Sequence, residues 1–516
     1  MFIIYAKISF FKKSDWLCEL LGIAMLNLKV KMVFWHGIFT ATKNIFMRAL
    51  LCFFLGLNSC LILAQSPLKA IDSLAQKQWV DSVYNNLSTK QKIGQLYMVQ
   101  VFSDRKNLDK EKLISLIKAQ EIGGLIYSKG GGLRQAHLNN EIQALSNIPL
   151  LIGMDAEWGL KMRLDSTFAF PWNMTLGAVK NLDLIRQTGQ HIGQHCKRLG
   201  VHFNFAPVVD INTNPNNPII GNRSFGEDKQ NVTDKALAFM QGMQSAGVLA
   251  AAKHFPGHGD TDADSHKTLP TVRFNKKRLQ NVELFPYKTL FKNGLSSVMV
   301  AHLNVPALES RDLYPSSLSK LIVTKLLKLK LNFKGLIFTD ALDMKGVSNY
   351  NSPGAIDLQA FKAGNDVLLM SGDVIQGMRQ IQAAYEKGQI SEARLAHSVK
   401  KILSAKYKVG LHRYKPIPIE NLVNDLNRKK DELLYERLMQ NAHTLVKNDA
   451  STLPIKDLQL QKIAYLPMGD VSGEGFYKTL RQYTAVKKIE SQNLDTVLTE
   501  LKAFSTVIIG FHKSDD

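Results

Sequence analysis

The segment Gly335-Leu-Ile-Phe-Thr-Asp340 is a short apolar run that ends in a carboxylate. Similar apolar runs alternate with longer amphipathic stretches from about residue 90 to residue 375. The runs cover residues 93–102, 123–127, 149–155, 203–209, 248–254, 296–302, 335–340 and 365–371. Eight strands, each followed by a segment able to form a helix, predict a (β/α)8 TIM barrel. A doubly wound open sheet is the alternative that this pattern leaves open.

Polar side chains stand at or just after the ends of these runs. The positions are Asp155, Asp210, His254, His302 and Asp340. In a barrel of parallel strands, the side chains at the carboxyl ends converge on one face above a packed interior. We therefore expect the chemistry of this protein at that face.

The composition is that of a globular protein with a sizeable core. Of the 516 residues, 45% are hydrophobic and 21% charged, with 34 Gly and 16 Pro, which excludes collagen-like and largely disordered chains. The net charge of +21 raises the question of a nucleic-acid partner. The basic residues are scattered apart from short runs at 325–330 and 428–430, and no RNA-binding or zinc-finger pattern is present, so we predict no nucleic-acid partner. Attraction to another anionic polymer or surface stays open.

Residues 47–64 have the features of an export signal: a basic start, an apolar run and a small residue before Gln65. The run is too short for a membrane span. We therefore assign residues 1–64 to an upstream extension and a signal peptide, and predict an exported, periplasmic protein without an integral membrane span in the mature chain. Residues 57–60 resemble a lipoprotein cleavage box, which would give a lipid anchor, but Asn58 fits that box poorly. Of the four cysteines only Cys196 follows residue 64, so no internal disulfide is expected.

The mature chain divides into two predicted domains. Residues 65–410 hold the barrel, and residues 411–516 form a linker and part of an α/β sandwich domain. In the second domain we predict strands at 444–447, 462–467, 485–489 and 506–511 and helices at 473–483 and 493–504. A helix would normally cover the last strand, and the sequence ends just after it, so we expect the sandwich domain to be incomplete.

The most polar segment is Lys253-His-Phe-Pro-Gly-His-Gly-Asp-Thr-Asp-Ala-Asp-Ser-His266, and its histidines and acids first suggest a metal site. His254 and His258 are four residues apart, as in helical zinc sites, but Pro256 and Gly257 between them make a helix unlikely. The alternating aspartates imitate a calcium loop, yet a serine replaces the required glycine and a threonine stands where the bidentate glutamate belongs. We predict no metal ion and no cofactor.

A second interpretation makes residues 256–267 a long, glycine-containing loop that can close over a site. Asp264 and His266 are two residues apart, so in an extended backbone their side chains point to the same side and the carboxylate can hydrogen-bond the imidazole. Such a pair can donate and accept protons, although a solvated polar loop is the simpler alternative. Across the barrel mouth, Asp340 could attack an anomeric carbon while the histidine protonates the leaving oxygen, as in retaining glycosidases. Taken alone, an aspartate at a strand end often caps the next helix.

Further charged residues lie near three of the predicted strand ends. They occur in Asp155-Ala-Glu-Trp-Gly-Leu-Lys-Met-Arg163, in Ile220-Gly-Asn-Arg-Ser-Phe-Gly226 and at Lys253 and His254. Asp, Arg and Lys side chains can bind sugar hydroxyls through paired hydrogen bonds, and an aromatic ring such as that of Trp158 can stack on a sugar face. Surface salt bridges are the alternative for any single residue. Their shared position at the strand ends favours a carbohydrate site.

Five motifs of this chain stand out together. They are Lys253-His-Phe-Pro-Gly-His-Gly259 with Asp264-Ser-His266, Asn204-Phe-Ala-Pro-Val-Val-Asp210, Gly221-Asn-Arg-Ser-Phe-Gly226, Val300-Ala-His-Leu303 and Phe338-Thr-Asp-Ala-Leu-Asp-Met-Lys-Gly346. In this order they closely resemble the motifs of glycoside hydrolase family 3 β-N-acetylglucosaminidases. The resemblance spans about residues 80–410, and a weaker likeness to the family's second domain covers residues 411–516.

The resemblance implies a retaining exo-hydrolase that removes terminal β-linked N-acetylglucosamine from cell-wall muropeptides or related glycans through a covalent glycosyl-enzyme. Asp340 matches the nucleophile, His266 the acid/base and Asp264 its partner. The residues that match the sugar-binding positions are Asp155, Arg163, Arg223, Lys253 and His254. The Asp264-Ser-His266 loop argues for the N-acetylhexosamine branch, because β-glucosidases and β-xylosidases of the family lack it.

Two segments depart from the family's pattern. Asp155-Ala-Glu-Trp-Gly159 stands where the family usually has Asp-Gln-Glu-Gly-Gly, which removes an amide and adds bulk beside the sugar site. The nucleophile loop reads Asp-Ala-Leu-Asp where Asp-Asp-Leu-Ser is commoner, so subsite preference is affected more than activity. A glycan-binding protein without turnover is a second hypothesis. A serine hydrolase is a third, but Ser-x-x-Lys at Ser115, Ser317 and Ser398 comes without its Ser-Asp-Asn and Lys-Thr-Gly partners.

Overall fold

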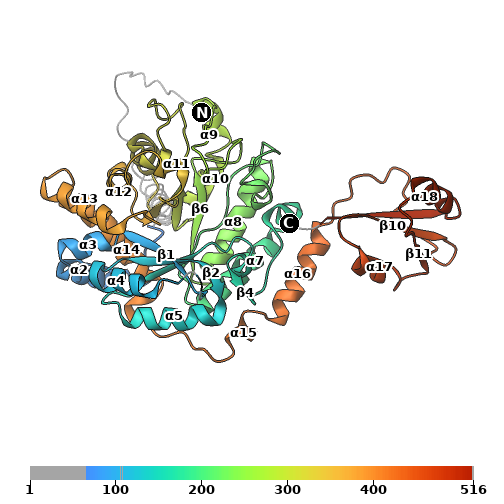
Figure 1. Ribbon diagram of the computed structural model, residues 1–516, viewed down its shortest axis with the longest axis horizontal. Helices are drawn as coiled ribbons and strands as arrows, with labels where there is room; N and C mark the ends of the chain where they lie inside the picture. The colour runs from blue at the N-terminus through green and yellow to red at the C-terminus, as the bar shows by residue number, and fades with distance from the viewer. Residues whose placement is uncertain (1–65, 105, 107, 514–516) are drawn as a thin grey trace, which may run out of the picture. The chain divides into compact units, whose positions relative to one another are not determined.

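The structure, a computed structural model, describes residues 66–104, 106 and 108–513. The predicted signal peptide, the extension before it and the cysteines at its positions lie outside the described residues. The chain forms two compact units that divide between Ala442 and His443, and Figure 1 labels their helices and strands. Within the described part of the chain, no helix is both long enough and apolar enough to cross a membrane.

The first unit is built on eight parallel strands in the order β8-β7-β6-β5-β3-β2-β1-β9. They are β1 (Tyr97–Phe102), β2 (Gly124–Gly131), β3 (Leu151–Met154), β5 (Phe203–Asn204), β6 (Leu249–Phe255), β7 (Ser297–Val300), β8 (Leu336–Thr339) and β9 (Leu368–Leu369). A short strand, β4 (Leu164–Asp165), pairs with β2 off this path. Each predicted apolar run overlaps one of the eight strands, so these strand predictions are confirmed.

The two ends of this strand order meet and close the ring. Met98 of β1 pairs with Leu369 of β9. On the other side, Phe338 of β8 forms a parallel bridge with Val367, whose N–H donates to the carbonyl of Ile337 at 3.0 Å. The predicted (β/α)8 barrel is therefore confirmed, and the open doubly wound sheet is excluded.

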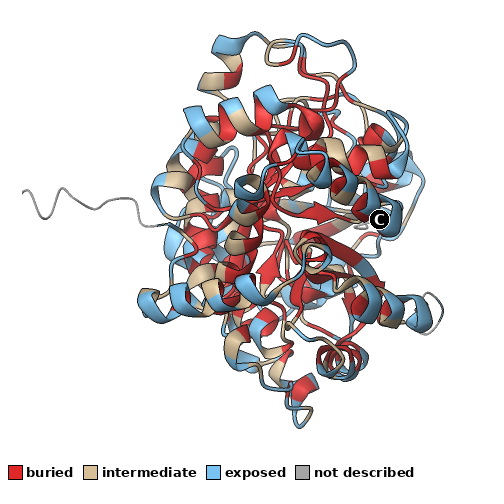
Figure 2. Cartoon of the chain, turned by 90° about the vertical axis from the view of Figure 1, so that its left-hand side faces the viewer, coloured by how far each residue is buried: buried red, intermediate tan, exposed pale blue. Residues whose placement is uncertain are grey.

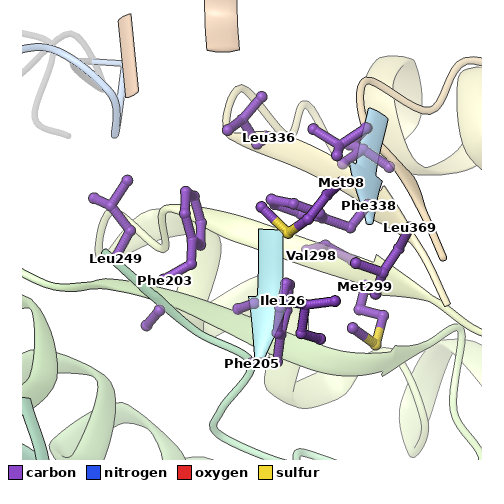
Figure 3. Close-up of a cluster of buried hydrophobic side chains, with 14 of the residues drawn as sticks. Met98, Ile126, Phe203, Phe205, Leu249, Val298, Met299, Leu336, Phe338 and Leu369 are labelled. Atoms are coloured by element: carbon purple, nitrogen blue, oxygen red, sulfur yellow. The ribbon is translucent and has the colours of Figure 1, made fainter. Parts of the chain in front are cut away.

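Large apolar side chains fill the inside of the barrel (Figure 3). The ring of Phe338 lies edge-on to Phe203 and Phe205, with centroids 5.1 and 5.2 Å apart, and the side chains of Met98 and Met299 lie beside them. All five are buried. Burial of apolar surface stabilises a fold by roughly 25 cal/mol per Å², so the interior is a packed core. Polar chemistry is left to the strand ends.

Helices surround the strands, with their buried faces turned inward and their exposed faces outward (Figure 2). The helices of this unit are α2 (Ser73–Asn86), α3 (Thr89–Gly94), α4 (Lys110–Gln120), α5 (Gly132–Ala144), α6 (Asn173–Ala178), α7 (Leu182–Arg198), α8 (Lys229–Ser245), α9 (Lys276–Asn281), α10 (Phe285–Lys292), η4 (Leu321–Lys330), α11 (Lys345–Ser348), α12 (Pro353–Ala363), α13 (Val374–Glu386), α14 (Glu392–Lys408), α15 (Leu422–Asp425) and α16 (Lys429–Ala442). Side chains of Asp109, Asp228 and Ser391 accept hydrogen bonds from the first turns of α4, α8 and α14, which satisfies backbone donors that a helix start leaves free.

Residues 411–442, predicted as part of a linker, belong to the barrel unit. The buried carboxylate of Asp431 in α16 meets His191 and His195 of α7 at 2.8 and 3.0 Å. Arg428, just before α16, pairs with the same carboxylate at 2.8 Å. A buried carboxylate with several partners fixes the helix that carries it, so α16 is anchored to the barrel.

The second unit holds a three-stranded parallel sheet in the order β11-β10-β12. Its elements are β10 (Ile463–Gly469), α17 (Glu474–Leu480), β11 (Val486–Lys488), α18 (Leu494–Leu501) and β12 (Thr506–His512). Tyr477 of α17 packs on the sheet face of Ile463, and Val497 of α18 on the face of Ala464, so the predicted α/β layering is confirmed. The predicted strand at 444–447 is wrong: these described residues form no strand, and Leu445 and Val446 are exposed.

Candidate active site

A cavity of about 530 Å³ opens at the carboxyl ends of the barrel strands. Asp155 follows β3, Lys253 and His254 lie in β6, and Asp340 follows β8. The predicted site residues that line the cavity are Asp155, Arg163, Arg223, Lys253, His254, His266 and Asp340. The structure thus brings seven of the eight together, and Asp264 adjoins the cavity through its hydrogen bond to His266.

Asp155 sits between two cations on one side of the cavity. Its carboxylate oxygens lie 2.6 Å from the Arg163 guanidinium and 2.7 Å from the Lys253 ammonium. Burial alone would raise the pKa of Asp155, but Lys253 and Arg163 outweigh it and hold the pKa well below its usual range. The carboxylate is therefore charged at neutral pH and available as a hydrogen-bond acceptor.

Glu157 is a part of this cluster that the sequence reasoning missed. It is fully buried, accepts two hydrogen bonds from Arg223 at 2.8 and 3.1 Å, and lies 2.8 Å from the Lys253 ammonium. Burial opposes its ionisation, yet Arg223 and Lys253 lower its pKa to about 2. It stands two residues after Asp155 in the motif, but no local pattern indicates that its side chain turns inward and contacts both cations.

The imidazole of His254 is held by a buried carboxylate. Asp210 lies 2.7 Å from His254 Nδ1, and it also accepts the backbone N–H of His258 at 2.7 Å. Arg223 Nη2 lies 3.3 Å from His254 Nε2. A carboxylate at Nδ1 and a guanidinium at Nε2 together fix the direction of the ring.

Asp340 lies in the cavity wall and keeps part of its surface exposed. Its backbone N–H donates to the carbonyl of Val300 at 2.8 Å, and one of its carboxylate oxygens accepts the N–H of Ala341 at 2.9 Å. Burial opposes its ionisation, but His254, His302 and the Ala341 hydrogen bond favour the charged form and lower the pKa of Asp340 below 3.8. A carboxylate that is ionised at neutral pH can act as a nucleophile.

Residues 256–267, which we name the flap, carry the predicted proton-transfer pair. Asp264 Oδ1 lies 2.8 Å from His266 Nδ1 and accepts the His266 backbone N–H at 2.9 Å. The predicted contact is present, but its predicted geometry is wrong: the Asp264 carbonyl accepts the N–H of Lys267, so the backbone turns here and is not extended. The His266 side chain is 57% exposed and lines the cavity, so it can reach both substrate and solvent.

One contact within the flap and one to the helix after Asp340 hold the flap in place beside His266. His258 Nε2 lies 3.1 Å from the hydroxyl of Ser265. Gly346, at the start of the short helix after Asp340, donates its N–H to the Ser265 carbonyl at 3.2 Å. A side chain at Gly346 would lie 2.8 Å from the carbonyl oxygens of Ser265 and Thr268, so the close approach of the flap needs glycine at this position.

The aspartates of the flap do not converge as calcium ligands would. Asp260 lies 3.2 Å from the guanidinium of Arg278, and Asp264 is engaged by His266. Among residues 66–104, 106 and 108–513, no group of three or more His, Cys, Asp or Glu side chains is placed to hold a metal ion.

Trp158 occupies a different environment from the one predicted. Its ring stacks on Trp172, with centroids 4.0 Å apart and an interplanar angle of 21°, and it is not among the residues that line the cavity. Trp172 precedes Asn173, whose side-chain amide donates to the carbonyl of Arg223 at 2.7 Å. The tryptophan pair is therefore outside the lining of the cavity.

A barrel in which carboxylates and a flap-borne imidazole line one cavity has the groups that a glycoside hydrolase needs. The profile of the "Glycosyl hydrolase family 3 N terminal domain" matches residues 88–405. Beta-hexosaminidase A of Pseudoalteromonas piscicida is 33% identical over 426 residues, which cover 76% of this chain and 70% of that relative. A beta-hexosaminidase of Nitrosomonas eutropha is 33% identical over 270 residues, which cover 51% of this chain and 76% of the relative.

A solved structure agrees with these relatives. The glycoside hydrolase family 3 beta-N-acetylglucosaminidase from Paenibacillus sp. str. FPU-7 has 30% sequence identity and a TM-score of 0.66, and the match covers 82% of this chain and 84% of that one. This chain belongs to glycosyl hydrolase family 3. The predicted resemblance to the β-N-acetylhexosaminidases of that family is confirmed, and the chain is a glycoside hydrolase of that group.

Proposed function

We propose that this protein is a retaining exo-hydrolase that removes terminal β-linked N-acetylglucosamine from cell-wall muropeptides or related glycans. Asp340 forms a covalent glycosyl-enzyme, and His266, paired with Asp264, is the acid/base. The names of the relatives support the sugar and the reaction class. The observation that carries the mechanism is that Asp340, from a strand end, and His266, from the flap, line one cavity.

In the first step His266 donates its proton to the glycosidic oxygen while Asp340 attacks the anomeric carbon. The bond to the leaving group breaks, and an ester bond between Asp340 and the sugar forms. In the second step His266 takes a proton from water, which attacks the same carbon and releases Asp340. The lowered pKa of Asp340 favours this division of roles, because the nucleophile must be charged when the acid is protonated.

The charged cluster around Asp155 binds the terminal sugar. Its carboxylate, together with Arg163, Arg223, Lys253 and His254, presents acceptors and donors toward the cavity. These groups already hold one another by ion pairs and hydrogen bonds before substrate arrives. Groups fixed in this way lose little freedom on binding, which favours tight and specific recognition of sugar hydroxyls.

Residues 47–64 support the proposal of an exported, periplasmic enzyme, because they have the pattern of an export signal. Leu57-Asn-Ser-Cys60 offers a lipid anchor as the alternative. Fractionation of cells that express the full chain tests this part. Activity in the periplasmic fraction supports export, membrane-bound activity that a Cys60→Ser variant releases supports the anchor, and cytoplasmic activity contradicts both.

The test of the activity is chromophore release from an aryl β-N-acetylglucosaminide, with the matching β-glucoside as control. We expect turnover of the first, and initial release of the β-anomer of the free sugar as seen by ¹H NMR. Asp340→Ala should abolish turnover. An enzyme inert on both glycosides contradicts the proposal, binding without turnover identifies a glycan-binding protein, and initial release of the α-anomer contradicts the covalent intermediate.

A further inference from the structure

A second cavity, of about 560 Å³, lies beside the proposed catalytic cavity. Its walls come from the end of β1, from α4 and from the segment after β9, through side chains such as Val101, Leu113, Ser115 and Val374. This volume is within the roughly 300–1,000 Å³ typical of pockets that bind small ligands. The proposed terminal-sugar site does not account for it.

Three residues line both cavities, namely Gln100, Asp343 and Met370. Side chains that form a wall of each space make the two cavities neighbours at the same end of the barrel. A ligand that extends out of the catalytic cavity past these residues enters the second one. The second cavity is therefore an extension of the site and not a separate pocket.

Asp343 identifies this extension as the side of the leaving group. It lines the catalytic cavity together with Asp340 and His266, and it also lines the second cavity. In the proposed mechanism, His266 protonates the oxygen that joins the terminal sugar to its leaving group. A residue that neighbours His266 and borders both cavities stands where the leaving group passes from one to the other.

The lining of the second cavity indicates what it accepts. Apolar side chains and the hydroxyls of Ser115 and Ser371 suit a sugar or short peptide, which has both apolar and hydroxyl or amide surface. Among the described lining residues, the charged groups are the carboxylates of Asp109, Asp343 and Asp373 and the single ammonium of Lys112. This balance repels an anionic leaving group and accepts a neutral or cationic one.

We infer that the second cavity is the subsite for the leaving group, and that Asp343 selects neutral or cationic leaving groups over anionic ones. The inference rests on the proposed function and narrows its substrate class to the related glycans with neutral or cationic leaving groups, because the leaving groups of muropeptides carry carboxylates. Asp343 acts by charge at the junction and takes no part in bond making or breaking.

The space of the subsite is tested by filling it. Ser115 is an exposed residue of α4 that lines the second cavity, so Ser115→Trp places a large ring there on a helix surface that tolerates it. Lys118→Trp, one turn along the same exposed helix and outside the lining, is the matched control. Substrates are an aryl β-N-acetylglucosaminide, with a short leaving group, and the β-1,4-linked trimer of N-acetylglucosamine.

We expect Ser115→Trp to raise KM for the trimer so that its kcat/KM falls at least about tenfold more than that for the aryl glycoside. Lys118→Trp should leave kcat/KM unchanged for both the trimer and the aryl glycoside. Equal behaviour of the two variants on the trimer overturns the inference while the proposed function stands. A wild-type enzyme inert on the aryl glycoside overturns the proposed function itself.

The charge of the subsite is tested with Asp343→Asn and Asp343→Ser. The paired substrates are the neutral disaccharide of two N-acetylglucosamines and the disaccharide of N-acetylglucosamine with N-acetylmuramic acid, whose lactyl group is a carboxylate. Wild type should prefer the neutral one, and both variants should reduce that preference by about 3- to 10-fold, less so at high salt. Asp495→Asn, in the second unit, is the control for loss of one negative charge. An unchanged preference in both Asp343 variants overturns the selection by charge.

Discussion

The two ends of the barrel bury similar clusters of charge and use them differently. At the carboxyl end, Asp155 is shared between Arg163 and Lys253, and its side chain keeps 15% of its surface exposed in the cavity. At the amino end, Asp366 is fully buried among cations. The groups that contact the Asp366 carboxylate are Lys328, Lys401, the hydroxyl of Ser398 and the backbone N–H of Ile337.

The comparison indicates that access to solvent and ligands, and not charge pairing, distinguishes a binding site from a buried structural ion cluster. Burial opposes the ionisation of Asp366, but Lys328, Lys401 and Arg394 hold its pKa far below 3.8. At Asp155, too, burial opposes ionisation while Lys253 and Arg163 favour the charged form. Asp366 lies just before β9, where its backbone N–H also bonds Ile337 and closes the ring, so we assign the amino-end cluster to stability and the carboxyl-end cluster to binding.

The largest expected effect on activity is at Asp340, at the carboxyl end of the barrel. Asp340→Asn should lower kcat on an aryl β-N-acetylglucosaminide by roughly 10⁴-fold or more, because the proposed covalent nucleophile is lost. Its free energy of unfolding should change less than that of Asp366→Asn, because Asp340 has no buried ion pair to break. Steady-state kinetics and urea denaturation of the same preparations measure both. A variant that keeps a tenth of the activity would contradict the assigned role.

The next largest expected effect is at Asp366, at the amino end of the barrel. Asp366→Asn leaves three cations without their carboxylate and should cost about 3–5 kcal/mol of unfolding free energy, while kcat per folded molecule stays within about twofold of wild type. The wild-type protein should lose the stability that Asp366 contributes as pH falls below about 4, because the folded pKa lies below the unfolded one and the unfolded chain then binds more protons. Urea denaturation between pH 3 and 7 should show a flatter profile for the variant. A large loss of kcat in Asp366→Asn would contradict the assignment of the amino-end cluster to stability and of the carboxyl-end cluster to binding.

A smaller effect tests how the flap is held at the carboxyl end of the barrel. Gly346→Ala places a methyl group against the carbonyl oxygens of Ser265 in the flap and of Thr268 just after it. It should shift His266 and lower kcat by about 10- to 100-fold, with little change in KM for a short aryl glycoside. Gly475→Ala, where a methyl group would meet nothing within 4 Å, is the matched control. Equal kcat values for the two variants would show that the flap position does not depend on this contact.

The smallest effect concerns a second buried charge near the amino end. Lys406 is fully buried with Gln95 Oε1 at 2.6 Å, and burial lowers the pKa of its ammonium from 10.5 to about 7. Between these values the unfolded chain binds more protons, so this group makes stability rise with pH above about 7, by at most about 1.4 kcal/mol per pH unit. Lys406→Met should remove that part of the slope, and Lys362→Met, at an exposed position, should keep it. Urea denaturation from pH 6 to 9 measures the slope, and parallel profiles would contradict the prediction.

The barrel could be predicted because each buried strand has a continuous apolar run, and a run of that kind depends only on its own residues. The strand at 444–447 was wrong for the converse reason. Leu445 and Val446 have the composition of a strand, but no neighbouring strand covers them in the second unit. Local pattern predicts a strand only where the tertiary structure supplies its partners.

The site was predicted less completely than the fold. His266 and Asp264 were paired correctly from their spacing, although a turn and not an extended backbone makes the contact. Glu157 and Asp366 were missed, because their cations come from distant parts of the chain: Arg223 lies 66 residues after Glu157, and Lys328 lies 38 residues before Asp366. Ion pairs of that separation leave no periodic signal in one sequence.

The histidine and the aspartate of the proposed reaction are carried by two different kinds of structure. Asp340 continues a strand locked into the core, whereas His266 rides on a surface turn fastened by a few polar contacts. Exchange of residues in that turn leaves the barrel interior untouched. The proposed proton donor and the proposed nucleophile thus stand on separate parts of the fold, so a substitution in the flap is expected to change the first without moving the second.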